Sequence, residues 1–501
     1  MNMIKFIAAW LRRLPWSFSI ALFVSLLAWL AIVATALTYL DVSTISHAVL
    51  KMFSDFNFEK PGVIGYLLKP LPVLFESIVI VAIFALGLLG SYNFAAWVSR
   101  RLYKRPRIYV HDPVAPAGGS GNMLSEFMES RGITDLRIGI ICAGGGAKGA
   151  YQAGSLKAIY EFLEKNNGLD KVKMISGTSI GSWNSMFWMA GLIKASAPGQ
   201  MSAHETWWKE IRVDRIVSFA PYAPMTKNYF LLTTPWQETF KTFFADNSAV
   251  KKALAERVFD NPDRALHFYL TRSNVVAGKL EFATNNAKLP GMMRKNWKTG
   301  GVEPVFSSDL YEVIAKQGEN DVIDRMRTAV FASMDLPPLF PYLQIDNKFF
   351  EDGGVVDNLP VRFATQIEHC NLLFVLPLNA SFETPADQKS VIKRLGRVME
   401  VRQGVLERES MKLTYLYNDL ARLNNPQKPE LVSVFAICPE QPLGINTSEF
   451  WKTKEAGQAF DLMYVASKHE LEDNFFEGTD PHALRMALVS PSGEITYREE
   501  F

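Results

Sequence analysis

A serine set between glycines is the first feature of this sequence with a clear chemical use. Residues 177–181 (GTSIG) have the G-x-S-x-G spacing, which lifts a serine onto a tight strand-to-helix turn with its hydroxyl exposed. The apolar run 172–175 predicts the strand that enters this turn, and the run 180–192 predicts a buried helix that leaves it. Because G-x-S-x-G often arises by chance, Ser179 becomes a candidate nucleophile only if other groups join it.

A glycine-rich segment upstream offers such a group. Residues 138–143 predict a buried strand that leads into 144–154 (GGGAKGAYQAG) and then into a helix over 155–164. Backbone N–H groups exposed before a helix can bind an anion, either a nucleotide phosphate or the oxyanion of an acyl-transfer intermediate. A Walker loop would need Ser or Thr after Gly-Lys, and a dinucleotide fold would need an acidic residue roughly 20 positions further on. Neither is present, so the sequence favours an oxyanion hole.

A carboxylate is the third candidate group. Asp352 follows residues 348–351, which predict a strand, and precedes Gly353 and Gly354. An aspartate before glycine often only binds the backbone of its own turn, so a structural role is the competing interpretation. The usual alternative base is a histidine, but none of the seven lies in a glycine-rich turn after the last strand, where an α/β-hydrolase places it. These histidines are His47, His111, His204, His267, His369, His469 and His482.

The three motifs in this order resemble the patatin-like phospholipase family over about residues 136–378, including 332–341 (ASMDLPPLFP) before the aspartate. The resemblance implies a three-layer α/β/α fold and hydrolysis of fatty-acyl esters in lipids, with no cofactor and no metal. It implies a dyad of Ser179 and Asp352. The oxyanion hole is then expected at Gly144, Gly145 and Gly146, with Gly145 and Gly146 as the main donors. Supporting motif positions are Lys148, Gly149, Gly177, Gly181, Gly353 and Gly354.

The expected reaction is a two-step acyl transfer. Asp352 accepts the proton of the Ser179 hydroxyl as it attacks the ester carbonyl, and water then hydrolyses the acyl-enzyme. Lys148 has two interpretations, steadying the glycine loop or attracting an anionic head group, and we favour the first. The leading function is therefore a membrane-anchored hydrolase of phospholipids or lysophospholipids. The alternatives are a non-catalytic membrane scaffold that binds lipid or protein partners, and a nucleotide-binding membrane protein. The intact motifs argue against a scaffold.

Two apolar runs near the N-terminus predict a membrane anchor. Residues 16–40 carry no charge and residues 71–98 carry only Glu76, and each run has roughly the 20 residues that cross a bilayer core. Basic residues flank the pair, whereas the loop 41–70 has mixed charges. The positive-inside rule places both flanks in the cytoplasm. We expect an integral protein of the bacterial inner (cytoplasmic) membrane with a cytoplasmic catalytic domain. The flanking basic residues are Lys5, Arg12, Arg13, Arg100, Arg101, Lys104, Arg105 and Arg107.

The remaining features divide the chain and limit its partners. We expect an anchor over 1–105, a linker over 106–122, the catalytic domain over 123–380 and an α/β extension over 381–501. A net charge of +2 gives no indication of nucleic-acid binding. Cys142, Cys370 and Cys438 have no metal-binding spacing and are expected to be buried thiols.

Several further elements are expected from the sequence. Residues 195–263 are expected to form a helical insertion rich in aromatic residues. We expect most of these aromatic side chains to belong to the core and a minority to line an acyl groove. The other expected elements are paired strands at 266–270 and 280–282, a long helix over 388–423 with a charged, solvated face, a strand at 431–438, a helix over 460–475 and a hairpin over 488–498.

Overall fold

The chain divides into two compact units, residues 1–104 with 214–235, and residues 105–213 with 236–501. The computed structural model describes residues 16–39, 71–102, 108–110, 120–197, 199–220, 229–259, 266–296, 298–316, 318–379, 391–425, 430–483 and 485–499.

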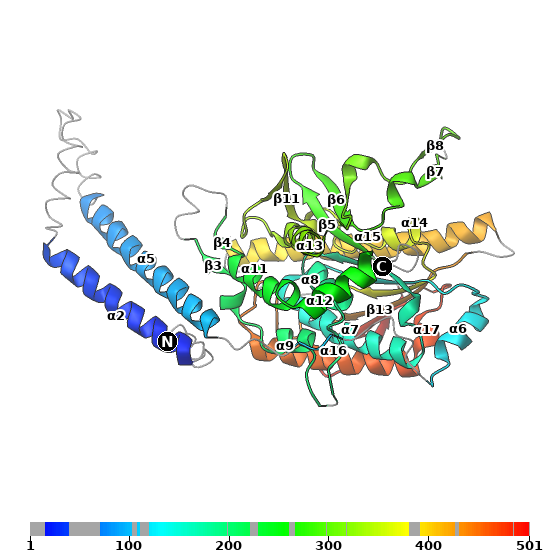
Figure 1. Ribbon diagram of the computed structural model, residues 1–501, viewed down its shortest axis with the longest axis horizontal. Helices are drawn as coiled ribbons and strands as arrows, with labels where there is room; N and C mark the ends of the chain where they lie inside the picture. Colours follow the sequence, from blue (N-terminus) through cyan, green and yellow to red (C-terminus); the bar gives the residue numbers. More distant parts are fainter. Residues whose placement is uncertain are drawn as a thin grey trace. The chain divides into compact units, whose positions relative to one another are not determined.

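The larger unit is built on an 11-stranded sheet, visible behind the labelled helices in Figure 1. Its main strand order is β10-β11-β5-β2-β1-β12-β13-β14-β15, with β6 beside β5 and β9 beside β6. The strands are β1 (Ile138–Cys142), β2 (Val172–Thr178), β5 (His267–Asn274), β6 (Lys279–Thr284), β9 (Tyr311–Val313), β10 (Leu343–Ile345), β11 (Lys348–Asp352), β12 (Leu372–Leu376), β13 (Ser433–Pro439), β14 (Met486–Val489) and β15 (Ile495–Arg498).

The strand directions determine where a site can form. The neighbours β5, β2, β1, β12, β13 and β14 run parallel. β15 pairs antiparallel with β14, β6 and β11 pair antiparallel with β5, β10 pairs antiparallel with β11, and β9 runs parallel to β6. Because the carboxyl ends of parallel strands share one edge of a sheet, the segments that follow β1, β2 and β12 converge there. The glycine loop and Ser179 are two of these segments.

Helices cover both faces of the sheet, as the three-layer prediction requires. Phe162 packs on Phe374, which is in register with Ile140 of the neighbouring strand, so one face carries the helix of Phe162. Tyr269 follows Phe268 and therefore points to the opposite face, where it stacks on Phe363. The first face carries α7 (Gly149–Lys165) with α16 (Thr453–Asp473) packed on it, and the second carries α14 (Arg362–Gln366) and α15 (Val391–Asn424) (Figure 1). α8 (Ile180–Met189) packs against β2, α7 and α13 (Glu319–Met334).

The aromatic insertion is mainly core, as expected. Trp183 of α8 makes ring contacts with Trp207, Trp236 and Phe244, and all four side chains are buried. This packing fixes α8, and with it the turn that carries Ser179. The insertion is nevertheless divided, because residues 214–235 group with the N-terminal unit. The smaller helices of the larger unit are α6 (Met123–Arg131), α9 (Ala203–Lys209), α12 (Ser248–Leu254) and α17 (Phe475–Gly478), while α11 (Thr234–Phe240) crosses the boundary between the units.

The N-terminal unit contains two long helices and a short strand pair. These are α2 (Trp16–Tyr39), α5 (Leu71–Arg101), β3 (Ser218–Phe219) and β4 (Leu231–Leu232). Asn93 of α5 binds the backbone of Phe219 twice, donating to its carbonyl (2.9 Å) and accepting from its N–H (3.0 Å). The helices α2 and α5 coincide with the two apolar runs, but no helix in the described part of the chain combines the length and the apolarity of a membrane span. The expected loop 41–70 lies outside the described residues.

The strands and helices expected downstream are present. β5 pairs antiparallel with β6, β13 joins the main sheet, and β14 and β15 form the terminal hairpin. The face of α15 differs from the expectation, because its solvent-exposed side is largely apolar and its buried side is largely polar. All three cysteines are buried and free, and burial raises the pKa of the Cys142 thiol to about 12.

Candidate active site

Ser179 occupies the turn between β2 and α8 in a strained backbone conformation. Its φ is +53° and its ψ is −123°, a region that a non-glycine residue adopts only when the surroundings enforce it. The Ser179 N–H donates to the hydroxyl of Ser333 on α13 (2.8 Å), which also receives a hydrogen bond from the Ser182 hydroxyl (2.8 Å). This is the geometry of a nucleophile elbow.

The flanking glycines are required by close backbone contacts. A Cβ atom on Gly177 would lie 2.6 Å from backbone atoms of Gly181 and Ser182. A Cβ atom on Gly181 would overlap the carbonyl of Cys142. The G-x-S-x-G spacing therefore lets α8 pass directly over the ends of β1 and β2.

The register of the sheet places Asp352 near Ser179. Thr178 is in register with Thr271 of β5, and the next residue, Arg272, is in register with Asp352 of β11. The side chains of Ser179 and Asp352 are close enough that hydrogen bonding to the Ser179 hydroxyl lowers the pKa of the Asp352 carboxyl group. Its Oδ1 atom also accepts the N–H of Gly354 (2.7 Å). Asp352 therefore caps its own turn beside the serine, so the structural interpretation does not exclude the catalytic one.

Burial dominates the electrostatics of this carboxyl group. Asp352 is 2% exposed, and desolvation raises its pKa to about 7. The hydrogen bonds from Ser179 and Gly354 act in the opposite direction, and the negative charge of Glu351 raises the pKa further. A second buried carboxyl group, Asp335, has its pKa raised well above the usual range by burial and by the charges of Asp352 and Glu351. A base with a pKa near 7 is matched to proton transfer at neutral pH.

The histidines that the structure describes hydrogen-bond elsewhere or lie apart from the dyad. His204 is buried against Asn184 (2.9 Å), and burial lowers its pKa to about 3, so it is neutral. His267 pairs with Glu368 (2.7 Å), and His469 pairs with Asp473 (3.3 Å). His47 and His111 lie outside the described residues.

The glycine loop lies beside the serine and leaves two N–H groups available. A Cβ atom on Gly144 would lie 3.1 Å from the Cβ of Ser179. The Gly144 N–H is engaged with the carbonyl of Asn358 (3.2 Å). The N–H groups of Gly145 and Gly146 make no hydrogen bond within the described part of the chain. These two N–H groups precede α7 and can donate hydrogen bonds to an oxyanion.

Lys148 is a structural cation rather than a surface charge. Its side chain is 1% exposed, and its ammonium group donates to Oδ1 of Asn379 and lies 4.0 Å from Glu400. Burial lowers its pKa, while Glu400 and Glu407 counteract this effect. The position supports the interpretation in which Lys148 steadies the loop.

Sequence reasoning missed a buried acid that connects the loops of the site. Glu407 of α15 is 2% exposed and accepts the N–H groups of Leu378 (3.1 Å) and Asn379 (2.9 Å). It also accepts from the side-chain amides of Asn358 (2.5 Å) and Asn379 (2.6 Å), and Asn358 in turn donates to the carbonyl of Gly144 (3.0 Å). One acidic residue among the charges of a long helix gives no sequence signal for this role.

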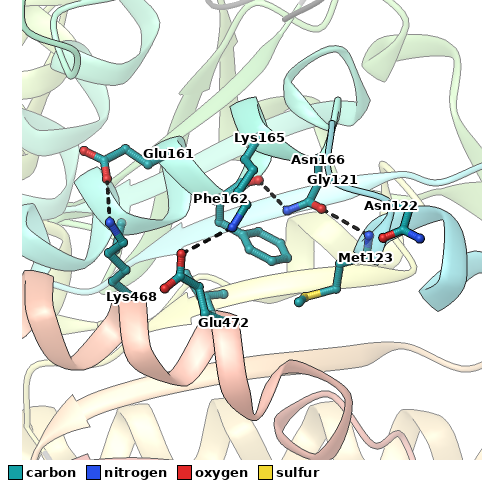
Figure 2. Close-up of a pocket in the computed structure, with 11 residues that line it drawn as sticks. Gly121, Asn122, Met123, Glu161, Phe162, Lys165, Asn166, Lys468 and Glu472 are labelled. Atoms are coloured by element: carbon teal, nitrogen blue, oxygen red, sulfur yellow. Dashed lines mark hydrogen bonds and ion pairs between the residues drawn. The ribbon is translucent and has the colours of Figure 1, made fainter. Parts of the chain in front are cut away.

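The larger unit also contains a cavity of about 430 Å³ that is separate from the candidate active site (Figure 2). It lies between α7, α16 and the residues before α6, and none of the residues that line it belongs to the candidate active site. Its charges face each other, with Lys468 4.0 Å from Glu161 and Lys165 3.5 Å from Glu472. The described residues contain no group of three or more His, Cys, Asp or Glu side chains arranged to hold a metal ion.

A mixed α/β sheet with helices on both faces, a serine on a strained elbow and a glycine loop beside it form the arrangement that serine hydrolases of the α/β/α class use. Residues 140–365 match the model of the patatin-like phospholipase family, so this part of the chain is a patatin-like phospholipase domain and the protein is a lipid acyl hydrolase. The chain also resembles the crystal structure of VipD from Legionella pneumophila over 68% of this chain and 67% of that chain, with 12% sequence identity and a TM-score of 0.31. None of the curated proteins compared matches this chain.

Proposed function

We propose that the protein hydrolyses fatty-acyl esters of phospholipids or lysophospholipids through a Ser179–Asp352 dyad. One arrangement carries this proposal: a serine held at positive φ beside a buried carboxyl group, whose pKa burial raises to about 7 and the serine hydroxyl lowers. A merely structural serine gains nothing from a strained backbone, whereas a nucleophile at the end of a strand needs it.

The reaction proceeds in two steps. Ser179 Oγ attacks the ester carbonyl while Asp352 takes its proton, and the N–H groups of Gly145 and Gly146 stabilise the oxyanion. The bond to the alcohol then breaks, and Asp352 returns the proton to the leaving oxygen. Water attacks the acyl-enzyme, Asp352 takes a proton from the water, and the fatty acid leaves as Ser179 is reprotonated.

We further propose that α2 and α5 attach the protein to a membrane, with the catalytic domain in the cytoplasm. The described side chains of α2 include Ile20 (57% exposed) and Phe23 (64% exposed), and Trp97 of α5 is 50% exposed. Exposed apolar surface of this extent on paired helices is typical of lipid contact. The basic residues that flank the two runs support the orientation.

The catalytic proposal is tested with a fluorophosphonate probe and a panel of lipids analysed by mass spectrometry. The probe is expected to label the native chain, and Ser179→Ala is expected to abolish labelling and ester hydrolysis. Asp352→Asn is expected to reduce the rate by roughly 10²–10⁴, the usual contribution of a general base. Labelling that persists in Ser179→Ala, or a single histidine substitution as damaging as Asp352→Asn, contradicts the dyad.

A further inference from the structure

The helix α15 presents an apolar face to solvent. Its outward apolar side chains are Val398, Val401 and Val405 in the first half and Leu413, Leu416, Leu420 and Leu423 in the second, with exposed fractions from 40% to 76%. The exposed carboxylate of Glu409 lies between the two halves of this stripe. Within each half, the spacings are three and four residues, which places the side chains in one stripe. We call these seven residues the outer face of α15.

The opposite side of α15 is polar and buried. Gln403, Glu407, Thr414 and Asn418 are each at most 6% exposed. Asn418 binds the backbone of Val432 twice, donating to its carbonyl (2.8 Å) and accepting from its N–H (2.8 Å). A surface helix of a globular protein normally buries its apolar stripe and exposes its polar one. In α15 this arrangement is reversed, so hydrogen bonds attach the helix to the domain and the outer face is free for another contact.

The buried side of α15 reaches the candidate active site. Arg402 donates to the carbonyl of Val355, just after the Asp352 turn, and Glu407 accepts from Asn358 and Asn379. The outer face is therefore rigidly connected to the loops that carry the dyad and the oxyanion hole. A surface that docks through this face holds the active site at a fixed distance from it.

The charged residues of α15 indicate what kind of surface its outer face contacts. α15 contains seven basic and four acidic residues, and one of the acidic residues, Glu407, is buried on the inner side. Arg402 and Lys412 flank the outer face and are exposed, and Lys412 pairs with the exposed Glu409 (3.1 Å), so the described helix keeps an excess of basic residues around this face. An apolar stripe with basic flanks fits the interface of an anionic bilayer, where leucine and valine enter the acyl region and the cations meet head groups. Two cationic helices of the same kind repel each other, which disfavours a second copy of this chain.

We propose that the outer face of α15 docks on an anionic phospholipid surface and thereby presents the active site to its substrate. The binding itself does not require the dyad to function, so the two proposals fail separately.

The experiment uses the full chain with Ser179→Ala, so that vesicles are not consumed. Leu416→Cys is labelled with the polarity-sensitive dye NBD, which the three buried native cysteines do not take up. Vesicles contain phosphatidylcholine alone or with about one third phosphatidylglycerol, and some carry a doxyl quencher on the acyl chain. The matched control is Val276→Cys, which is 78% exposed in the turn between β5 and β6. We expect blue-shifted emission and doxyl quenching for position 416 with phosphatidylglycerol vesicles, and neither change for position 276.

Activity of the enzyme with an intact Ser179 provides the second readout. Leu416→Asp with Leu420→Asp is expected to lower hydrolysis of phosphatidylglycerol vesicles at least tenfold and to change hydrolysis of a soluble short-chain ester less than twofold. Blue emission from position 416 before vesicles are added would show that protein covers this face, through another segment or a second copy, and would overturn the proposal. Equal quenching at positions 416 and 276, or no quenching at either, would also overturn it.

Discussion

The environment of Asp352 determines the pH at which this site can work. The carboxyl group is withdrawn from water next to Glu351 and Asp335, while only Ser179 and the N–H of Gly354 stabilise its charge directly. A proton acceptor must be ionised before it can act, so under the proposed mechanism the fraction of active enzyme depends on the raised pKa of Asp352. The burial of this one carboxyl group is therefore expected to set the pH dependence of activity.

The first prediction concerns this pH dependence. With a soluble, uncharged ester, kcat/KM is expected to rise with pH through about 7, because Asp352 becomes ionised there. Glu351→Gln removes a negative charge that raises the pKa of Asp352, so the rise is expected at lower pH. The measurement is the pH profile of kcat/KM for the native chain and the variant.

The control for this experiment is Asp346→Asn, which removes an exposed carboxylate in the turn between β10 and β11. Its profile is expected to match that of the native chain. A profile that Glu351→Gln leaves unmoved, or moves to higher pH, would refute the assignment of the titration to Asp352.

At the scale of elements, the candidate active site is held by contacts from a helix that lies outside the matched family region. The match covers residues 140–365, whereas α15 begins at Val391. Through Glu407, this helix binds Asn358, and Asn358 holds both backbone groups of Gly144. The direction of the next two N–H groups, those of Gly145 and Gly146, follows from that anchoring. We therefore propose that Glu407 is a positioning residue for the oxyanion hole.

The second prediction tests this role. Glu407→Gln keeps the volume of the side chain but replaces one acceptor oxygen with a donor, so it cannot bind all four N–H groups. We expect kcat for a soluble ester to fall by up to about 10²-fold with KM little changed, because misplaced oxyanion donors affect the transition state most. The rate of fluorophosphonate labelling is expected to fall in parallel.

Glu409→Gln serves as the matched control, since Glu409 is exposed on the same helix and pairs only with Lys412 (3.1 Å) among the contacts that the structure gives it. It should leave both rates unchanged. An increase in KM with an unchanged kcat would instead indicate that Glu407 shapes the substrate pocket.

The motifs were predictable from the sequence because each depends on local backbone demands. Gly177 and Gly181 mark a turn with no space for side chains, and Asp352 before two glycines marks a strand end. The hydrophobic periods also predicted β13 and the β14–β15 hairpin. The parts that escaped prediction depend on tertiary partners. Nothing local to Glu407 reveals its four N–H donors, and α15 departs from the rule that the apolar stripe of a helix faces the core.

At the scale of the whole molecule, an insertion in the catalytic sequence belongs to the N-terminal unit. Residues 214–235 group with residues 1–104, and Asn93 of α5 binds Phe219 as a strand neighbour would. Deleting the N-terminal residues would therefore remove the partners of this segment as well. A test of the anchor should keep the chain intact and probe which side of a membrane each part occupies.

The third prediction is the topology of the intact chain in cells. Five basic residues lie between positions 100 and 107 and would be costly to translocate, while the loop 41–70 has mixed charges. We expect Ser54→Cys to react with a membrane-impermeant maleimide in intact cells, and Val276→Cys in the catalytic unit to react only after lysis. The native cysteines are buried and give little background. The reverse pattern would place the catalytic unit on the outer side. Protection of both positions until lysis would rule out a spanning anchor and leave surface contacts, such as the outer face of α15, as the route by which the enzyme reaches lipid.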